Sequence, residues 1–433
     1  GEKMKVIGKI LKILGILLLA LVLLLAAADA AWIYVPQIKA AKRIDDVDAY
    51  AAPVEALTVR EGAGIIALGE ATHGNAEFQR LRRDVLERLT EEYGVRAFAL
   101  EADFGEAAGV DEYIKGGAGT AAEALNGLSF TIYHTREMEQ LIEWMRAYND
   151  GAAEGEKLSF YGFDMQNPDA DLRLLSGFCA ENGVLDELSA AEKLAALAED
   201  DGAFSALCES ADFDIVTAVH DELTDNAAGY DGAEGYEYAL HAAECALQAA
   251  ELARAHAGDD YIKYNNIRDG FMAENVAWIS ARESAQGRSA IMISGHDGHV
   301  AAKAPYYTPM GAHLKERFGD GYFVIGTDFF KTRCNINSSD GTGRGNHSFC
   351  SADPLAAQAK RLGGSYYLDF AGVSEGGETY TLLHSAMTMG SLGEGYTFLM
   401  KLLPQSYRTA DIPAELYDAM IFVYSASPIT LTE

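Results

Sequence analysis

Basic residues are scarce in this chain. Its 433 residues include 34 Lys and Arg but 65 Asp and Glu, which gives a formal net charge of −31. Binding to nucleic-acid phosphates depends on clustered Lys and Arg, so this balance argues against a nucleic-acid partner and indicates an acidic surface. Hydrophobic residues make up 49% of the chain, enough for a packed core in one large domain or two ordinary ones.

Cysteine is scarce too. The five cysteines are odd in number, widely spaced and without a Cys-x-x-Cys motif, which excludes a zinc knuckle and gives no disulfide framework. We expect free, buried thiols at Cys179, Cys208, Cys245, Cys334 and Cys350. A bridge between Cys334 and Cys350 is the alternative if the body of the protein is exported.

The usual nucleophile motifs of hydrolases are absent. The chain has no Gly-x-Ser-x-Gly elbow, no cysteine near a motif histidine and no His-Glu-x-x-His. The glycines between Gly341 and Gly345 do not form a dinucleotide fingerprint, because the third glycine is misplaced. Histidines and carboxylates are therefore the groups left to carry chemistry.

The N-terminal residues form a separate unit. Lysines precede an apolar run from Ile13 to Val35 that only Asp29 interrupts, a length sufficient to cross a bilayer. Trp32 and Tyr34 fall where an interfacial aromatic belt belongs.

We therefore expect residues 1–35 to be an uncleaved transmembrane helix that anchors the protein to a membrane, with a cleaved signal peptide as the alternative. The lysine-rich flank favours an N-terminus inside the cell. Residues 36–433 would then form a catalytic domain outside the cytoplasm.

The segment from Gly64 to Gly74 organises the rest of the chain. A short apolar run, Ile65–Leu68, is typical of a buried strand, and Glu70 and His73 follow it directly. Ligands bind at the carboxyl ends of strands in parallel sheets. A helix over residues 75–93 and a second apolar run complete a strand–helix–strand unit, which predicts a parallel sheet.

The same pattern recurs along the chain. Apolar runs at 97–100, 158–163, 290–294 and 322–327 each stop at an acid, a histidine or both. We therefore predict an α/β fold with a mainly parallel central sheet flanked by helices. Its carboxyl edge would gather Glu70, His73, Glu101, Asp164, His296 and His299, with Asp328 nearby.

Two long segments lack this pattern. Residues from about 171 to 287 are rich in Ala and Glu at helical spacing and predict a large helical insertion, a lid or wall over the strand ends. Within it, Arg268 pairs with Asp269 on the surface or points at a site carboxylate or substrate oxygen. Residues 335–351 predict a loop, and 365–370 and 419–424 predict two more strands.

Imidazoles beside carboxylates can activate water in two ways. A histidine held by a glutamate can take the proton directly as water attacks a carbonyl. Alternatively, the same side chains can bind a divalent metal ion that lowers the pKa of its bound water to about 7. Residue types alone do not separate these mechanisms.

Several motifs together resemble the erythromycin esterase family. They are Gly69-Glu70-Ala-Thr72-His73-Gly74, Glu101 after its strand, Arg268-Asp269-x-x-Met272, and Gly295-His296-Asp297-Gly298-His299. They occur in the order found in that family, and the resemblance covers essentially everything after residue 36. One departure is Asp297, because an Asn commonly follows the first histidine of that loop.

The resemblance implies an α/β hydrolase, unrelated to serine esterases, that opens macrolide lactones with water and no cofactor. His73 would be the general base, with Glu101 orienting it or sharing its proton. Glu70, His296 and His299 would shape the site and polarise the carbonyl of a small-molecule ester. Arg268 and Asp164 would bind substrate.

The sequence is therefore compatible with three functions. The first is a membrane-anchored esterase that needs no metal. The second is a metal-dependent hydrolase or peptidase, and the third is an exported binding protein without turnover. The metal ligands in the second would be Glu70, His73, Glu101, His296 and His299.

Overall fold

The computed structural model describes the chain except for residues 186–187, 200–207, 209–212, 231, 257–259 and 433. Its centre is a nine-stranded sheet in the order β3-β2-β4-β1-β5-β11-β7, with β6 and β9 also paired to β5. Along this order every pairing is parallel except that of β7 with β11. The strands are β1 Ile65–Glu70, β2 Ala97–Asp103, β3 Ser159–Asp164, β4 Ile291–His296, β5 Tyr322–Ser338, β6 Gly343–Cys350, β7 Ser365–Asp369, β9 Gly395–Tyr396 and β11 Ala419–Ala426.

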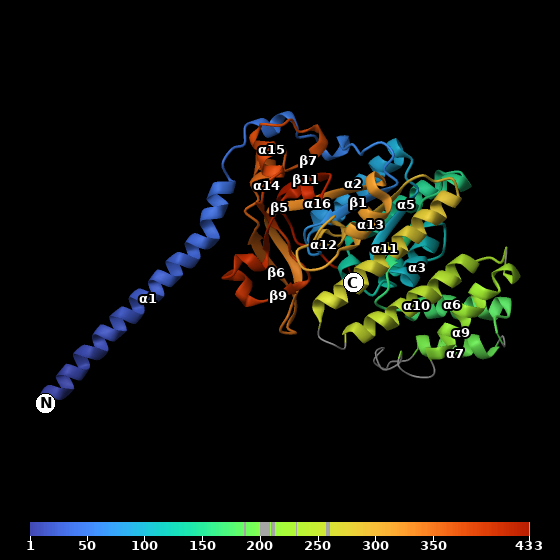
Figure 1. Ribbon diagram of the computed structural model, residues 1–433, viewed down its shortest axis with the longest axis horizontal. Helices are drawn as coiled ribbons and strands as arrows, with labels where there is room; N and C mark the ends of the chain where they lie inside the picture. Colours follow the sequence, from blue (N-terminus) through green and yellow to red (C-terminus); the bar gives the residue numbers. More distant parts are fainter. Residues whose placement is uncertain (186–187, 200–207, 209–212, 231, 257–259, 433) are drawn as a thin grey trace.

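Helices cover both faces of this sheet (Figure 1). Ile66 and Leu68 of β1 face a core shared with α2 and α5, whereas Ile65 and Ala67 face a second core shared with α11 and α13. Both faces are buried, so the strands are continuous apolar runs. The α/β prediction is confirmed. These helices are α2 Ala76–Tyr93, α3 Phe104–Ile114, α4 Ala121–Asn126, α5 Arg136–Gly151, α11 Tyr261–Ala285, α13 Met310–Phe318 and α14 Pro354–Gln358.

The strand order brings distant parts of the chain together at one edge. β4 lies between β1 and β2, although both precede it by far in the sequence. In the parallel register Glu70 is opposite His296, and Leu100 of β2 is opposite Ser294 of β4. The polar residues that follow these strands therefore start from neighbouring positions.

The described elements between β3 and β4 are all helices. α6, α7, α9 and α10 pack around a third apolar core of their own beside the sheet, at the lower right of Figure 1. The last helix, α11, returns to the sheet and packs near β3. This segment forms a separate side layer. The other helices are α6 Asp169–Asn182, α7 Leu188–Ala198, α9 Asp214–Asp225 and α10 Tyr236–His256.

The sequence prediction was wrong for residues 335–351. β5 does not stop at Asp328 but continues to Ser338, and it pairs with β6 in an antiparallel hairpin. Buried residues alternate along the distal half of β5 and hold it as a strand, whereas the Gly- and Ser-rich segment forms only the turn. Asp328 thus lies inside a strand, where it accepts hydrogen bonds from the backbone N–H groups of Phe329 and Gly390.

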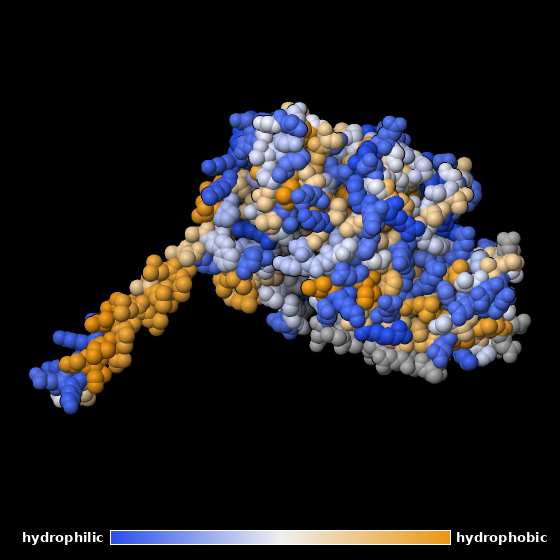
Figure 2. Space-filling view, viewed as in Figure 1, coloured by the Kyte–Doolittle hydropathy of each residue, from blue (hydrophilic) through white to orange (hydrophobic). Residues whose placement is uncertain are grey.

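The N-terminal helix α1 spans Glu2–Ala40 and runs through Pro36, five residues past the predicted boundary. Its most apolar window has a mean hydropathy of 2.9 and is not buried against the body (Figure 2). It is long and apolar enough to cross a membrane, a test that a signal sequence also passes. Just beyond α1, the carbonyl of Lys42 accepts a hydrogen bond from Gln358 in α14.

All five cysteines are buried and outside any disulfide, as expected. In the β5–β6 hairpin Cys334 is opposite His347, and Cys350 is opposite Lys331. The two thiols therefore do not face each other across the strands, and the alternative disulfide does not form in this structure.

Gly311 provides a test of the packing that supports the site. A Cβ atom there would lie 2.0 Å from the carbonyl oxygen of Val300 and 2.4 Å from that of Ala301. Both are rigid backbone atoms just after the His299 turn. We expect Gly311→Ala to lower the free energy of unfolding by about 1–3 kcal/mol through overpacking, measured by urea denaturation of the full chain in detergent.

The matched control is Gly109→Ala in α3, where a Cβ meets nothing within 4 Å. That variant should be neutral or stabilise the protein by about 0.4–1 kcal/mol, since alanine restricts the unfolded chain. Equal stabilities for the two variants would contradict the close approach of α13 to the His299 turn.

Candidate active site

The predicted side chains converge at the carboxyl edge of the sheet. His73, His296 and His299 line a cavity of about 540 Å³. The rings of His73 and His296 lie 5.0 Å apart between centroids, and those of His296 and His299 lie 6.3 Å apart. Glu70, Glu101, Asp164 and Arg268 are buried directly behind these rings. All seven candidate residues thus form one cluster.

Two glycines allow the segment Gly69–Gly74 to bend toward this cluster. A Cβ at Gly69 would lie 1.8 Å from a carboxylate oxygen of Asp297, and one at Gly74 would lie 2.6 Å from the carbonyl oxygen of Asn335. The absence of side chains allows β1 and the turn after it to approach their neighbours closely. Glu70 then ends β1, and His73 follows in the turn.

Glu70 holds His73 in one orientation. The Nδ1 atom of His73 lies 2.7 Å from Oε1 of Glu70. With Nδ1–H donating to the carboxylate, the neutral ring presents a lone pair at Nε2, and the described part of the chain places no hydrogen-bond partner on that atom. Glu101 was expected to orient His73 or share its proton, but the carboxylate in contact with the ring is that of Glu70.

Arg82 of α2 lies behind Glu70 and was not among the predicted site residues. Its side chain is 1% exposed, and its Nη2 lies 2.8 Å from Oε1 of Glu70. Nε donates to Ser294, and the guanidinium stacks over the ring of Tyr133. A buried arginine therefore balances the charge of the buried glutamate.

These charges tune the pKa of His73. Burial alone would lower that pKa, but the carboxylates of Glu70 and Glu101 outweigh burial and hold it above the ordinary value of 6.5. Glu70 is itself buried, which favours its neutral form, yet Arg82 and His73 keep the pKa of this carboxyl below its usual range. The pair therefore combines an ionised carboxylate with a comparatively basic imidazole.

Arg268 is the second buried cation and joins the ends of β2 and β3. It reaches in from α11 and binds Asp164 with two nitrogens, at 3.1 Å from Nε and 2.6 Å from Nη2. The same Nη2 lies 2.8 Å from Oε1 of Glu101. The sequence allowed Arg268 either a surface pair with Asp269 or a position facing the site. The structure shows the second, because Arg268 binds two site carboxylates.

Glu101 is held ionised by its neighbours. Burial would raise its pKa, but the nearby His299, Arg268 and His73 outweigh burial and hold the pKa of this carboxyl far below its usual range. Its second oxygen accepts a hydrogen bond of 2.7 Å from the backbone N–H of His296. Glu101 thus fixes the start of the histidine loop.

His299 lies between an acid and Arg268. Its Nδ1 is 2.9 Å from Asp269, and its Nε2 is 3.0 Å from Nη1 of Arg268. Because a guanidinium can only donate, this contact forms when the ring is neutral, with Nε2 as the acceptor and Nδ1–H as the donor to Asp269. Asp269 also accepts the backbone N–H of Met310 and so ties the loop to α13.

His296 has both ring nitrogens occupied. Nδ1 accepts the backbone N–H of Gly298 at 3.1 Å, so Nε2 carries the proton and lies 3.2 Å from the carbonyl oxygen of Leu392. Burial, together with the neighbouring imidazoles of His73 and His299, lowers the pKa of His296 to about 4. His296 is therefore a neutral hydrogen-bond donor at pH 7.

These side chains are a poor fit to a metal ion. The residues that the structure describes contain no group of three or more His, Cys, Asp or Glu arranged to hold one. Both glutamates are bound by arginines, and His299 faces a guanidinium through its Nε2. A cation would have to displace Arg82 and Arg268 from buried ion pairs, which is costly.

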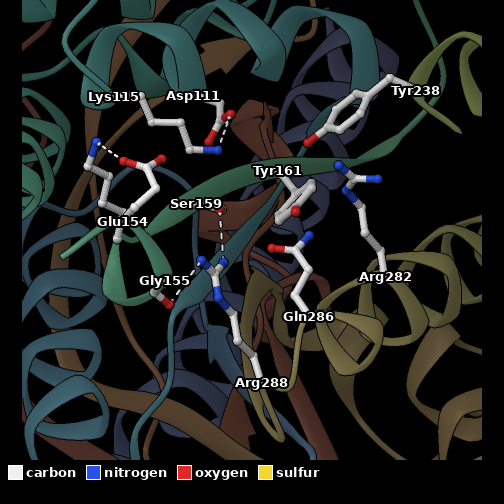
Figure 3. A pocket seen from close by; sticks show the side chains of 11 residues that line it. Asp111, Lys115, Glu154, Gly155, Ser159, Tyr161, Tyr238, Arg282, Gln286 and Arg288 are labelled. Atoms are coloured by element: carbon white, nitrogen blue, oxygen red, sulfur yellow. Dashed lines mark hydrogen bonds and ion pairs between the residues drawn. The ribbon is translucent and has the colours of Figure 1, made fainter. Parts of the chain in front are cut away.

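A second cavity, of about 420 Å³, lies at the other end of β3 (Figure 3). It begins at Ser159, the first residue of β3, and so is remote from the carboxyl edge. Its charged side chains form ion pairs, Lys115 with Asp111 and Arg288 with buried Glu283. No histidine is among its described lining residues, whereas His73, His296 and His299 line the first cavity. The first cavity is therefore the candidate active site.

The Arg268 network generates a stability prediction. Arg268→Ala would leave Glu101 and Asp164 as buried, unpaired carboxylates, which costs about 3–5 kcal/mol when one partner of a buried pair is removed. Adding Asp164→Asn should recover part of that loss, because one buried charge is gone. Urea denaturation of the full chain in detergent measures both.

The exposed Arg317 in α13 supplies the control, since Arg317→Ala should change stability by no more than about 0.5 kcal/mol. A loss in Arg268→Ala that Asp164→Asn leaves unchanged would point to lost packing, and the charge explanation would then be wrong.

Sequence comparisons agree with the motifs. A family model described as erythromycin esterase matches residues 90–426, a range that starts after the Glu70–His73 turn. Erythromycin esterase type II from Escherichia coli is 25% identical over 300 residues, which are 60% of this chain and 68% of that protein. The putative hydrolase YbfO of Bacillus subtilis (strain 168) is 21% identical over 317 residues, 65% of this chain and 68% of that protein.

Solved structures share the fold. A protein from Bacillus cereus superposes with a TM-score of 0.75 at 19% identity, over 92% of this chain and 99% of that one. A mutant of the erythromycin esterase EreC in its open conformation has a TM-score of 0.58 at 21% identity, over 86% and 93%. The family model spans most of the described body and the fold agrees, so this chain belongs to the erythromycin esterase family, and that membership supports a hydrolase.

Proposed function

We propose that this protein hydrolyses a lactone or other carboxylic ester with water activated by His73. The observation that carries the proposal is the His73–Glu70 pair, whose uncommitted Nε2 belongs to a ring that lines the 540 Å³ cavity. A histidine oriented by a buried carboxylate is the arrangement that general-base catalysis requires. No other side chain in the cluster offers an uncommitted basic nitrogen.

In the proposed reaction, Nε2 of His73 takes a proton from water as the water oxygen attacks the ester carbonyl. Glu70 stabilises the imidazolium that forms, and Arg82 keeps Glu70 ionised. The tetrahedral intermediate then expels the alkoxide, which receives the proton back from His73. The products are a carboxylic acid and an alcohol, and the enzyme returns to its starting state.

His296 is placed to polarise the carbonyl. Its Nε2–H makes only a 3.2 Å contact with the carbonyl oxygen of Leu392, a long hydrogen bond that a substrate oxygen could replace. Because His296 stays neutral, it can donate without adding a positive charge beside His73. Arg268 and Asp164 hold Glu101 and His299 in position from behind.

The cavity walls favour a bulky substrate. Tyr261 from α11 and Tyr306 from the loop after His299 line the cavity and are 73% and 77% exposed. Exposed aromatic rings at a cavity provide apolar faces for a large ring or chain. A macrolide is one such ester, and rates on a panel of different esters would distinguish it from other bulky substrates.

Replacing His73 tests the proposed base. His73→Ala should reduce kcat/KM by roughly 10²–10⁴-fold, the range that one general base contributes. The measurement is ester hydrolysis by the full chain in detergent, on aryl esters, simple lactones and macrolides, with and without a chelator. His384→Ala, which removes an exposed histidine at the end of α15 (Glu378–Leu383), should keep full activity.

The same assay separates the alternatives. Turnover that a chelator abolishes would support the metal-dependent hydrolase or peptidase and contradict the mechanism above. Full activity in His73→Ala would also contradict it. An absence of turnover on the whole panel, together with measurable binding of an ester, would favour the non-catalytic binding protein.

The pH profile gives an independent test. The base must be neutral, and the pKa of His73 is raised, so kcat/KM should fall as the pH drops through a value above 6.5. Glu70→Gln removes the main charge that raises this pKa, so the falling limb should move to lower pH as the activity declines. Glu91→Gln, at an exposed position on α2, should leave the limb in place. An unmoved limb in Glu70→Gln would mean that another group titrates.

A further inference from the structure

The segment after β9 exposes an unusual set of apolar side chains. Phe398, Leu399 and Leu402 are 69%, 58% and 42% exposed, although they lie within five residues of one another. Met400 in the same 3₁₀ turn is buried in the main core and fixes the turn in place. The turn therefore holds its other apolar side chains outward, with exposed Lys401 among them. We call Phe398, Leu399 and Leu402 the apolar patch.

The chain just after this patch contacts the end of the apolar helix. Arg408, a few residues after the patch, donates a hydrogen bond of 3.2 Å from Nη2 to the carbonyl oxygen of Ile33 in α1. Asp29 and Tyr34 of α1 are also near, since they add to burial in raising the pKa of Tyr407. In Figure 1 the segment after β9 lies on the side of the body toward α1, and Figure 2 shows apolar surface there.

The position of the Arg408–Ile33 contact along α1 indicates which part of a bilayer the patch would meet. The apolar run from Ile13 to Val35 is about 35 Å long at 1.5 Å per residue, close to the thickness of a bilayer core. Trp32 and Tyr34 mark its interfacial end. Because Arg408 contacts Ile33 between these aromatic residues, a bilayer crossed by α1 would meet the nearby patch at the boundary between headgroups and acyl chains.

We propose that the apolar patch docks into the bilayer that α1 crosses, so that the catalytic body rests on the membrane rather than on a free tether. Apolar side chains inserted at the interface, with a lysine among them for lipid phosphates, are a common mode of peripheral membrane contact. This orientation of the catalytic body on the membrane does not depend on the reaction proposed at His73.

Site-directed spin labelling of the full chain in phosphatidylcholine vesicles tests this contact. The native thiols are buried, so a label introduced by Phe398→Cys or Leu399→Cys can be read against the labelled wild type as a blank. The matched control is Leu185→Cys, an exposed leucine just after α6, a helix that lies on the far side of the body from α1 in Figure 1. Collision with oxygen, which concentrates in lipid, is compared with collision with a water-soluble nickel chelate.

Docking predicts that labels at positions 398 and 399 collide several-fold more with oxygen than with the nickel chelate, whereas the label at 185 shows the reverse. High nickel access at all three positions would overturn the proposal. Low access to both agents, with spin–spin broadening that grows with protein density, would identify a second copy of the chain as the occupant and would also overturn it.

Discussion

The candidate site depends on the burial of two guanidinium groups beside two glutamates. Arg268 and Arg82 are both almost fully buried, and each binds a carboxylate at the carboxyl edge of the sheet. A buried carboxylate without a partner would take up a proton, and a neutral Glu70 would not hold His73 in a basic state. The arginines therefore keep the glutamates ionised, and the ionised glutamates set the properties of the histidines.

The three imidazoles end up with different chemistry although their residue type is the same. His73 shares a proton with Glu70 and is comparatively basic, whereas His296 is kept neutral by burial and by its neighbours. His299 is locked between Asp269 and Arg268. Adjacent groups with pKa values displaced in opposite directions are what acid–base catalysis uses, and here the backbone N–H of Gly298 and the guanidinium of Arg268 fix the tautomers.

The sequence predicted the residues that end strands better than those that lie behind them. Glu70, Glu101 and His296 each interrupt an apolar run, and that contrast is visible without coordinates. Arg82 was missed although a signal existed, because it lies four residues after Phe78 and three before Val85 and thus falls within the apolar stripe of α2. The Leu392 carbonyl could not be predicted, since a backbone group in an irregular segment carries no side-chain signal. The β5–β6 hairpin was hidden by its polar composition.

One segment of the chain links the cavity to the proposed membrane contact. Met389 and Gly390 of β8 (Met387–Gly390) and Thr409 and Asp411 of β10 (Arg408–Asp411) line the cavity, and the apolar patch lies between these two strands in the sequence. The same connection supplies the Leu392 carbonyl that holds His296. A patch seated in lipid would therefore place the cavity close to the bilayer surface. Bulky apolar esters concentrate there by partition, so this geometry suits the substrate size that the cavity walls indicate.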